Sequence, residues 1–177
     1  MIADENPRSQ ADANAEQLAL SLVHDAFDAA RTGDSARLAG LLARGVPANV
    51  RTDKGDSLLM LATYHGHVAA SRVLLERGAE PELANDRGQT PLGGAAFKGD
   101  VACARLLLEN GARASSPMAD GKTPAMLAAM FDQVAVLELL SEWGANLQQR
   151  GPAQATALDL ARAMGATRAV AWLEARV

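Results

Sequence analysis

Apolar residues recur along the chain in short groups that fit one face of an α-helix, and polar segments rich in glycine separate these groups. Near the beginning of the chain, five apolar residues fall at i, i+1, i+4, i+5 and i+8: Leu22, Val23, Ala26, Phe27 and Ala30. This spacing places their side chains on one side of a helix. Gly33 is expected to end that helix, and a partner helix is predicted over residues 34–44.

The same pattern of residue types returns every 33 residues, as the positions of Gly55, Gly88 and Gly121 show. Three motifs follow these glycines in register: Ser57-Leu58-Leu59, Thr90-Pro91-Leu92 and Thr123-Pro124-Ala125; then Gly66-His67, Gly99-Asp100 and Asp132-Gln133; then Gly78-Ala79, Gly111-Ala112 and Gly144-Ala145. Each copy contains two short apolar segments that are too small to bury a core alone. The copies are therefore expected to stack against one another.

The chain divides into five units, of which the first and the last are degenerate: 16–50, 51–83, 84–116, 117–149 and 150–177. The order Thr-Pro-Leu, Gly-His and Leu-Leu-x-x-Gly-Ala resembles the ankyrin repeat. The resemblance runs from about Leu18 to Val177 and implies an all-α solenoid of helix-turn-helix units. β-turn arms with little true sheet would join the units, and the last unit would cap the stack. The polar residues 1–15 lack apolar periodicity and are predicted to form a flexible tail.

The charge and the cysteine content limit which classes of molecule the protein is expected to bind and where in the cell it is expected to lie. The net charge is −4 and the Lys and Arg residues are scattered, which disfavours nucleic acid and anionic membranes as partners. Cys103 is the only cysteine, so a disulfide framework is excluded and a buried thiol is expected. The sequence shows neither a signal peptide nor a membrane-spanning stretch. A cytoplasmic location is expected, although an exported protein that had lost its signal would look the same.

Two departures from the ankyrin pattern bear on stability. The His that usually follows Thr-Pro-Leu and ties adjacent units by hydrogen bonds is replaced by other residues: Met60, Gly93, Met126 and Asp159. Stability is therefore expected to depend on packing. In addition, Gly93 and Gly94 lie inside a predicted helix, where each costs about 1 kcal/mol relative to Ala. They indicate either a close approach of two backbones or a locally soft unit.

Candidate catalytic and metal-binding groups have simpler interpretations. His65 and His67 could hold a metal ion, but no Cys or carboxylate recurs at ligand spacing, so no metal or other cofactor is expected. Asp56, Ser57 and His65 could form a catalytic trio, but Ser57 occupies the helix-capping position of Thr90. The sequence contains no phosphate loop and no nucleophile elbow. A non-catalytic protein is predicted.

Ankyrin-like stacks bind proteins through a concave face, formed by the first helix of each unit, and through the tips of the arms. Six residues occupy the concave positions before the turn of three consecutive units: Tyr64, His65, Phe97, Lys98, Met130 and Phe131. Three of the six aromatic residues of the chain fall there, and an exposed apolar patch usually marks a binding site. The alternative is that these rings pack between helices.

Two further groups of residues belong to the predicted binding surface. The arm tips carry mixed charges in register: Asp53, Lys54, Asp86, Arg87, Asp120 and Lys122. These charges would set the orientation and the association rate of a partner more than its affinity. Trp143 could rim the same groove or simply cover the cap.

The sequence therefore predicts a monomeric, non-catalytic module that binds a protein through its concave face and arm tips. It is similar to short bacterial ankyrin-repeat proteins, some of which accompany a catalase and support antioxidant defence. Two alternatives stay open: an immunity or inhibitor protein that occludes a toxin or enzyme, and a metal-linked or enzymatic protein. A tight complex with strong charge complementarity would indicate the first, and metal retained after purification would indicate the second.

Overall fold

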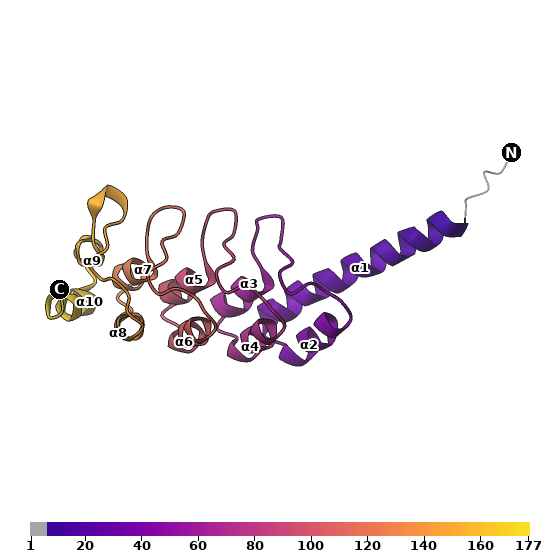
Figure 1. Ribbon diagram of the computed structural model, residues 1–177, viewed down its shortest axis with the longest axis horizontal. Helices are drawn as coiled ribbons and strands as arrows, with labels where there is room; N and C mark the ends of the chain where they lie inside the picture. The colour runs from indigo at the N-terminus through magenta and orange to yellow at the C-terminus, as the bar shows by residue number, and fades with distance from the viewer. Residues whose placement is uncertain (1–6) are drawn as a thin grey trace.

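In the computed structural model, α-helices alternate between two layers, and arms project from one side of the stack (Figure 1). The structure describes residues 7–177, with side chains from residue 12 onward. The inner layer, beside the arms, comprises α1 (Pro7–Thr32), α3 (Leu58–Tyr64), α5 (Pro91–Lys98), α7 (Pro124–Met130) and α9 (Ala157–Met164). The outer layer comprises α2 (Ser35–Ala43), α4 (Val68–Glu76), α6 (Val101–Glu109), α8 (Val134–Glu142) and α10 (Thr167–Glu174).

The arms are irregular segments between an outer helix and the next inner helix. They span residues 44–57, 77–90, 110–123 and 143–156, and the last contains a 3₁₀ turn, η1 (Pro152–Gln154). Within residues 7–177 they form no strand, only an isolated antiparallel bridge between Arg51 and Ser57. The chain is thus an all-α repeat solenoid, and this confirms the fold class that the sequence predicted.

Local sequence signals set where the helices begin and end. The hydroxyl of Thr90 accepts a hydrogen bond from the backbone amide of Gly93 (3.2 Å), which caps the start of α5. Pro91 occupies the first helical position, where its missing N–H leaves no bond unmade. Gly99 ends α5 with φ of 75°, and Asp132 adopts φ of 57° at the matching turn after α7. Both turns were predicted from the sequence.

Two columns of identical residues, each repeated every 33 positions, form the centre of the core. Leucines of the outer helices make one column, with relative exposures of 5% or less: Leu41, Leu74, Leu107, Leu140 and Leu173. Fully buried alanines of the inner helices make the other: Ala29, Ala62, Ala95, Ala128 and Ala161. Alanine allows the inner helices to approach closely, and leucine fills the space between the layers. The repeat of the sequence is therefore a repeat of the core.

α1 is longer than the sequence indicated. Residues 7–15, which were predicted to belong to a flexible tail, are helical, while residues 1–6 lie outside the described part of the chain. This stretch is polar but contains three alanines, the residue that favours helix most, and extension of an existing helix avoids the cost of nucleation. Leu22 and Val23 pack on the core, whereas Leu18 and Leu20 are exposed. The N-terminal part of α1 extends past the stack (Figure 1). No helix within residues 7–177 is long and apolar enough to cross a membrane.

Polar contacts also join neighbouring units, in addition to the packing on which stability was expected to depend. The Nε2–H of His67 donates to the carbonyl oxygen of Arg31, 2.8 Å away in the preceding unit. The Asp132 carboxylate accepts from the Arg168 guanidinium (2.9 Å) and from the backbone N–H of Ala169 (2.7 Å). The hydrogen bond from Arg168, together with that from Ala169, holds the pKa of Asp132 below its ordinary value. His67 belongs to the Gly-His motif that the sequence displayed, whereas the pairing of Asp132 with Arg168 is not part of that motif.

Candidate binding groove

A groove of about 650 Å³ lies on the concave side, between the inner helices of the central units and the arms. Its floor is the backbone of α5 at Gly93 and Gly94, where no side chain rises. Apolar side chains from three units form its walls: Met60, Leu61, Tyr64, Phe97, Met118 and Leu127. Polar groups of the arms line the rim: Asp56, Asn85, Arg87, Gln89 and Asp120. A hollow of this size, with mostly apolar walls and a few polar groups, is typical of a binding site.

The two floor glycines are there for different physical reasons. A Cβ atom on Gly93 would lie 2.7 Å from the Sδ atom of Met118, so this glycine accommodates a close approach. One of the two alternatives from the sequence was a close approach of two backbones. The structure shows instead that a side chain of the next arm approaches Gly93. A Cβ atom on Gly94 would meet only the Tyr64 ring, at an ordinary 3.6 Å. Packing therefore does not require a glycine at position 94.

The three rings of the predicted aromatic column lie on the concave side, and two of them, Phe97 and Phe131, are in contact, whereas Tyr64 and Phe97 line the groove together. Tyr64, the last residue of α3, is 41% exposed, and Phe131, just after α7, is 39% exposed. Phe97 lies between them and is half-buried, with its ring centroid 4.4 Å from that of Phe131 in an edge-on arrangement. The Lys98 ammonium stands 5.0 Å from the centroid of the Tyr64 ring. The column is thus partly open to solvent at both ends rather than packed between the helices.

The other predicted residues of the concave surface are more widely distributed. His65 is exposed and lines the groove beside Tyr64. Lys98 lines an adjoining hollow of about 290 Å³, which shares Tyr64 and His65 with the groove. Met130 is half-buried and lies outside the groove. Trp143 follows the outer helix α8 and does not line the groove, so the suggestion that it forms the rim is not supported.

Only two of the six charged arm residues singled out in the sequence line the groove, namely Arg87 and Asp120. Asp53 and Lys54 are exposed on the first arm, away from it. Asp86 pairs with Arg51 at 2.9 Å, and Asp120 pairs with Lys122 at 2.7 Å. Partial burial opposes ionisation of Asp120, but the hydrogen bonds and the charge of Lys122 lower its pKa below the ordinary value.

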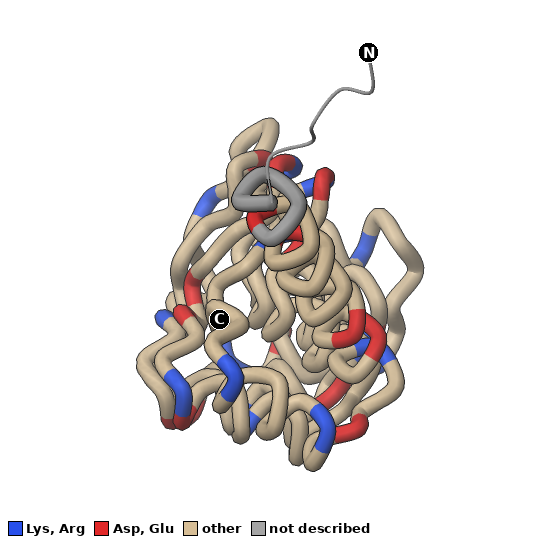
Figure 2. The backbone as a smooth tube through the Cα atoms, turned by 90° about the vertical axis from the view of Figure 1, so that its right-hand side faces the viewer, with Lys and Arg blue, Asp and Glu red and all other residues tan. Residues whose placement is uncertain are grey.

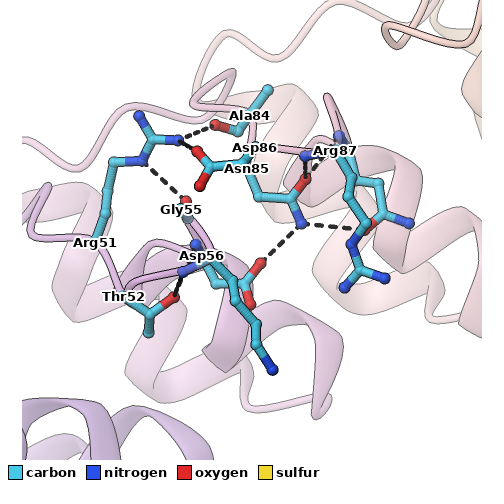
Figure 3. Close-up of polar contacts among 10 residues, drawn as sticks. Arg51, Thr52, Gly55, Asp56, Ala84, Asn85, Asp86 and Arg87 are labelled. Carbon is cyan, nitrogen blue, oxygen red and sulfur yellow. Dashed lines mark hydrogen bonds and ion pairs between the residues drawn. The ribbon is translucent and has the colours of Figure 1, made fainter.

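Asn85 connects the first two arms and fixes the rim of the groove (Figure 3). Its side-chain amide donates to the Asp56 carboxylate (2.8 Å), and its carbonyl oxygen accepts from the backbone amides of Arg87 (3.1 Å) and Gln89 (3.0 Å). This residue is buried, although it lies in an arm. Sequence reasoning missed it. The available signal was an Asn just before the Asp-Arg-Gly tip, where Asn side chains commonly bond the backbone two residues on.

Comparison with known proteins agrees with the repeat geometry. The family model for ankyrin repeats in three copies matches residues 26–118, and the model for a single ankyrin repeat matches residues 120–152. The chain belongs to the ankyrin-repeat family. Ankyrin repeats are protein–protein interaction modules. The chain is also 48% identical over 69 residues to a protein of Pseudomonas aeruginosa, PA3287, whose name assigns it ankyrin repeats. That match covers 39% of this chain and 38% of the relative's length.

Chemically reactive side chains in this ankyrin stack are mostly engaged in structure. The Ser57 hydroxyl is buried and accepts a hydrogen bond from the backbone amide of Met60 (3.1 Å), which caps α3. Burial, assisted by the charge of Asp100, raises the pKa of the Cys103 thiol to about 12 and keeps it protonated. Across residues 7–177, His, Cys, Asp and Glu form no group of three or more that could hold a metal ion. The groove therefore offers shape and hydrogen bonds for binding.

Proposed function

We propose that this ankyrin-repeat protein binds a partner protein through the concave groove and catalyses no reaction there. The single observation that carries the proposal is Gly94. A helical glycine costs about 1 kcal/mol relative to alanine, and the space for an alanine side chain is present. A local cost without a packing reason is typical of a functional position. At Gly94, the consequence of the missing side chain is an open floor for the groove.

The aromatic side chains around this floor support the same proposal. Tyr64 and Phe97 rise on either side of it, and Phe131 extends their row to the next unit. Partly exposed aromatic rings that border a hollow supply a large share of the energy at many protein interfaces. Arg87 adds a guanidinium at the rim, a group that is also enriched at interfaces.

The test is affinity capture from a lysate of the source cells with three baits. The wild-type chain is compared with Tyr64→Ala/Phe97→Ala, which removes the walls of the groove, and with Trp143→Ala, which removes an exposed aromatic side chain outside it. We expect a protein that wild type and Trp143→Ala retain and that the double variant loses. Thermal melts of the three baits establish that each is folded. The same proteins on all three baits would refute binding through the groove.

The resemblance to short bacterial ankyrin proteins makes a stress-defence enzyme such as a catalase the first partner to examine. If the captured partner is an enzyme, its activity with and without the ankyrin protein separates two functions. An adaptor leaves that activity unchanged or increases it. The alternative, an immunity or inhibitor protein that occludes an active site, abolishes the activity in the complex.

A further inference from the structure

The carboxylates near the groove are already bonded within the chain. In the view of Figure 2, acidic and basic residues are interspersed over the tube and neither sign gathers on one side. At the groove and its adjoining hollow, three carboxylates each have an internal donor: Asp56 from Asn85, Asp100 from the amide of Cys103, and Asp120 from Lys122. Their hydrogen-bonding capacity is therefore partly occupied before any partner arrives.

Two cationic side chains at the same surface form no ion pair with a carboxylate among residues 12–177. Among residues 12–177, the side chains of Arg87 and Lys98 make neither an ion pair nor a hydrogen bond. The Lys98 ammonium lies over the Tyr64 ring, 5.0 Å from its centroid. A guanidinium offers five N–H donors and an ammonium offers three. Arg87 and Lys98 therefore offer cationic donors at this surface that no carboxylate among residues 12–177 engages.

The shape of the surface indicates an extended occupant. The groove and the adjoining hollow share Tyr64 and His65, so together they run from the arm rim at Arg87 to the end of α5 at Lys98. Gly94 lines the groove from α5, the helix that follows the arm of Arg87 and ends at Lys98. A linear segment can place an apolar side chain on this floor while polar groups on either side reach the two cations.

We infer that the groove recognises an acidic linear segment of the partner protein. A large apolar side chain of the segment sits over Gly94, and carboxylates near it in sequence bind Arg87 and Lys98. Carboxylate pairing with arginine is short, directional and frequently bidentate, so Arg87 contributes specificity as well as attraction. This inference rests on the proposed function and adds the chemistry of the partner to it.

The experiment selects random short linear peptides, displayed on phage, against the immobilised full-length chain. Three variants are selected in parallel with wild type. Gly94→Leu fills the floor of the groove, and Arg87→Glu/Lys98→Glu reverses its two open cations. Arg72→Glu/Arg105→Glu makes the same change of charge at two exposed, matching positions of the outer helices α4 and α6. Thermal melts establish that all four proteins are folded.

We expect wild type to enrich peptides that contain an aromatic or long aliphatic residue close to Asp or Glu. A synthetic peptide of that consensus should bind wild type and Arg72→Glu/Arg105→Glu equally in a fluorescence anisotropy titration. It should bind Arg87→Glu/Lys98→Glu at least about 10-fold more weakly at low ionic strength, with a smaller difference at high salt. Selection on Arg87→Glu/Lys98→Glu should turn the consensus toward Lys and Arg.

Three results would overturn the inference: a consensus without Asp or Glu, equal binding to the groove charge-reversal variant, or enrichment that Gly94→Leu does not abolish. Failure to enrich any peptide on wild type would overturn it as well, because the inference requires a linear segment. The proposed function has a separate test. A partner protein that depends on Tyr64 and Phe97 in the capture experiment would keep the groove as the binding site and discard only the acidic segment.

Discussion

The buried columns of the stack and the concave ends of the inner helices use the 33-residue repeat in opposite ways. In the outer layer the same residue returns in all five units, as Leu41, Leu74, Leu107, Leu140 and Leu173, and each is buried. At the ends of the inner helices the residue differs from unit to unit, with Tyr64, Phe97 and Met130 in register, and each is at least partly exposed. Packing restricts the leucine positions to one shape, whereas partly exposed positions tolerate different side chains. Stability and recognition are thus assigned to different columns of the same repeat.

Truncation of a core leucine should give the largest effect. Leu107→Ala removes a side chain that is fully buried in the middle unit, and we expect a loss of about 2–5 kcal/mol in unfolding free energy from lost burial and the resulting cavity. Leu18→Ala is the matched control, because Leu18 is 56% exposed on the free part of α1. Urea denaturation followed by circular dichroism measures both. Similar midpoints for the two variants would contradict the assignment of stability to the leucine column.

The two floor glycines should respond differently to the same substitution. Gly94→Ala is expected to raise the unfolding free energy by about 1 kcal/mol, because helix propensity improves and the new Cβ has room. Gly93→Ala should gain less or lose stability, because its Cβ would force the Met118 sulfur to move. Denaturation midpoints compare the pair directly. An equal gain at both positions would show that Met118 yields without cost and that Gly93 has no packing role.

The ion pair between Asp132 and Arg168, which joins the last two units, predicts a smaller and pH-dependent effect on the unfolding free energy. Asp132→Asn keeps a residue that tolerates the left-handed turn but removes the charge paired with Arg168, for an expected loss of about 0.2–1 kcal/mol near neutral pH. The folded-state pKa of Asp132 is lowered, so the wild-type advantage is present above the unfolded value of about 4 and is lost as the pH falls through the folded value. Melting temperatures from neutral to acidic pH should therefore converge. A constant difference at all pH values would rule out the ionic contribution.

The smallest change in stability is expected on the concave column itself. Tyr64→Ala removes a partly exposed ring, so the unfolding free energy should move by no more than about 0.5 kcal/mol. Calorimetric unfolding of wild type and variant provides the measurement. A loss comparable with that of Leu107→Ala would place Tyr64 in the core and remove the basis for a separate recognition surface.

The sequence predicted what depends on the repeat and missed what depends on contacts between particular side chains. The spacing of Gly55, Gly88 and Gly121 was enough for the solenoid and its arms, because each unit repeats the same backbone. The aromatic column followed from the same register. The different roles of Gly93 and Gly94 could not be predicted from the sequence. They depend on the position of Met118 in the next arm, which fills the space beside Gly93 and leaves the space beside Gly94 open. The helical start of α1 was missed because polar composition was taken as a sign of disorder.

The sequence also could not predict that the Arg87 guanidinium would lack a carboxylate partner among residues 12–177. All four arm tips contain charged or polar residues, and no spacing rule tells which of them will pair. The structure pairs Arg51 with Asp86 and Lys122 with Asp120, and within residues 12–177 it gives the Arg87 guanidinium no carboxylate partner. Such pairing depends on how side chains of adjacent arms meet in space.

The position of the groove along the stack has a consequence for heating. Units of a solenoid contact only their neighbours, so the array frays from its ends before its middle opens. The lining of the groove extends from Asp56 to Leu127 and includes no residue of α1, α2, α9 or α10. Amide hydrogens of the terminal helices should therefore exchange with solvent while those of α5 remain protected. The binding surface would then persist through the first stages of melting, because the terminal units unfold and refold without disturbing the residues that line the groove.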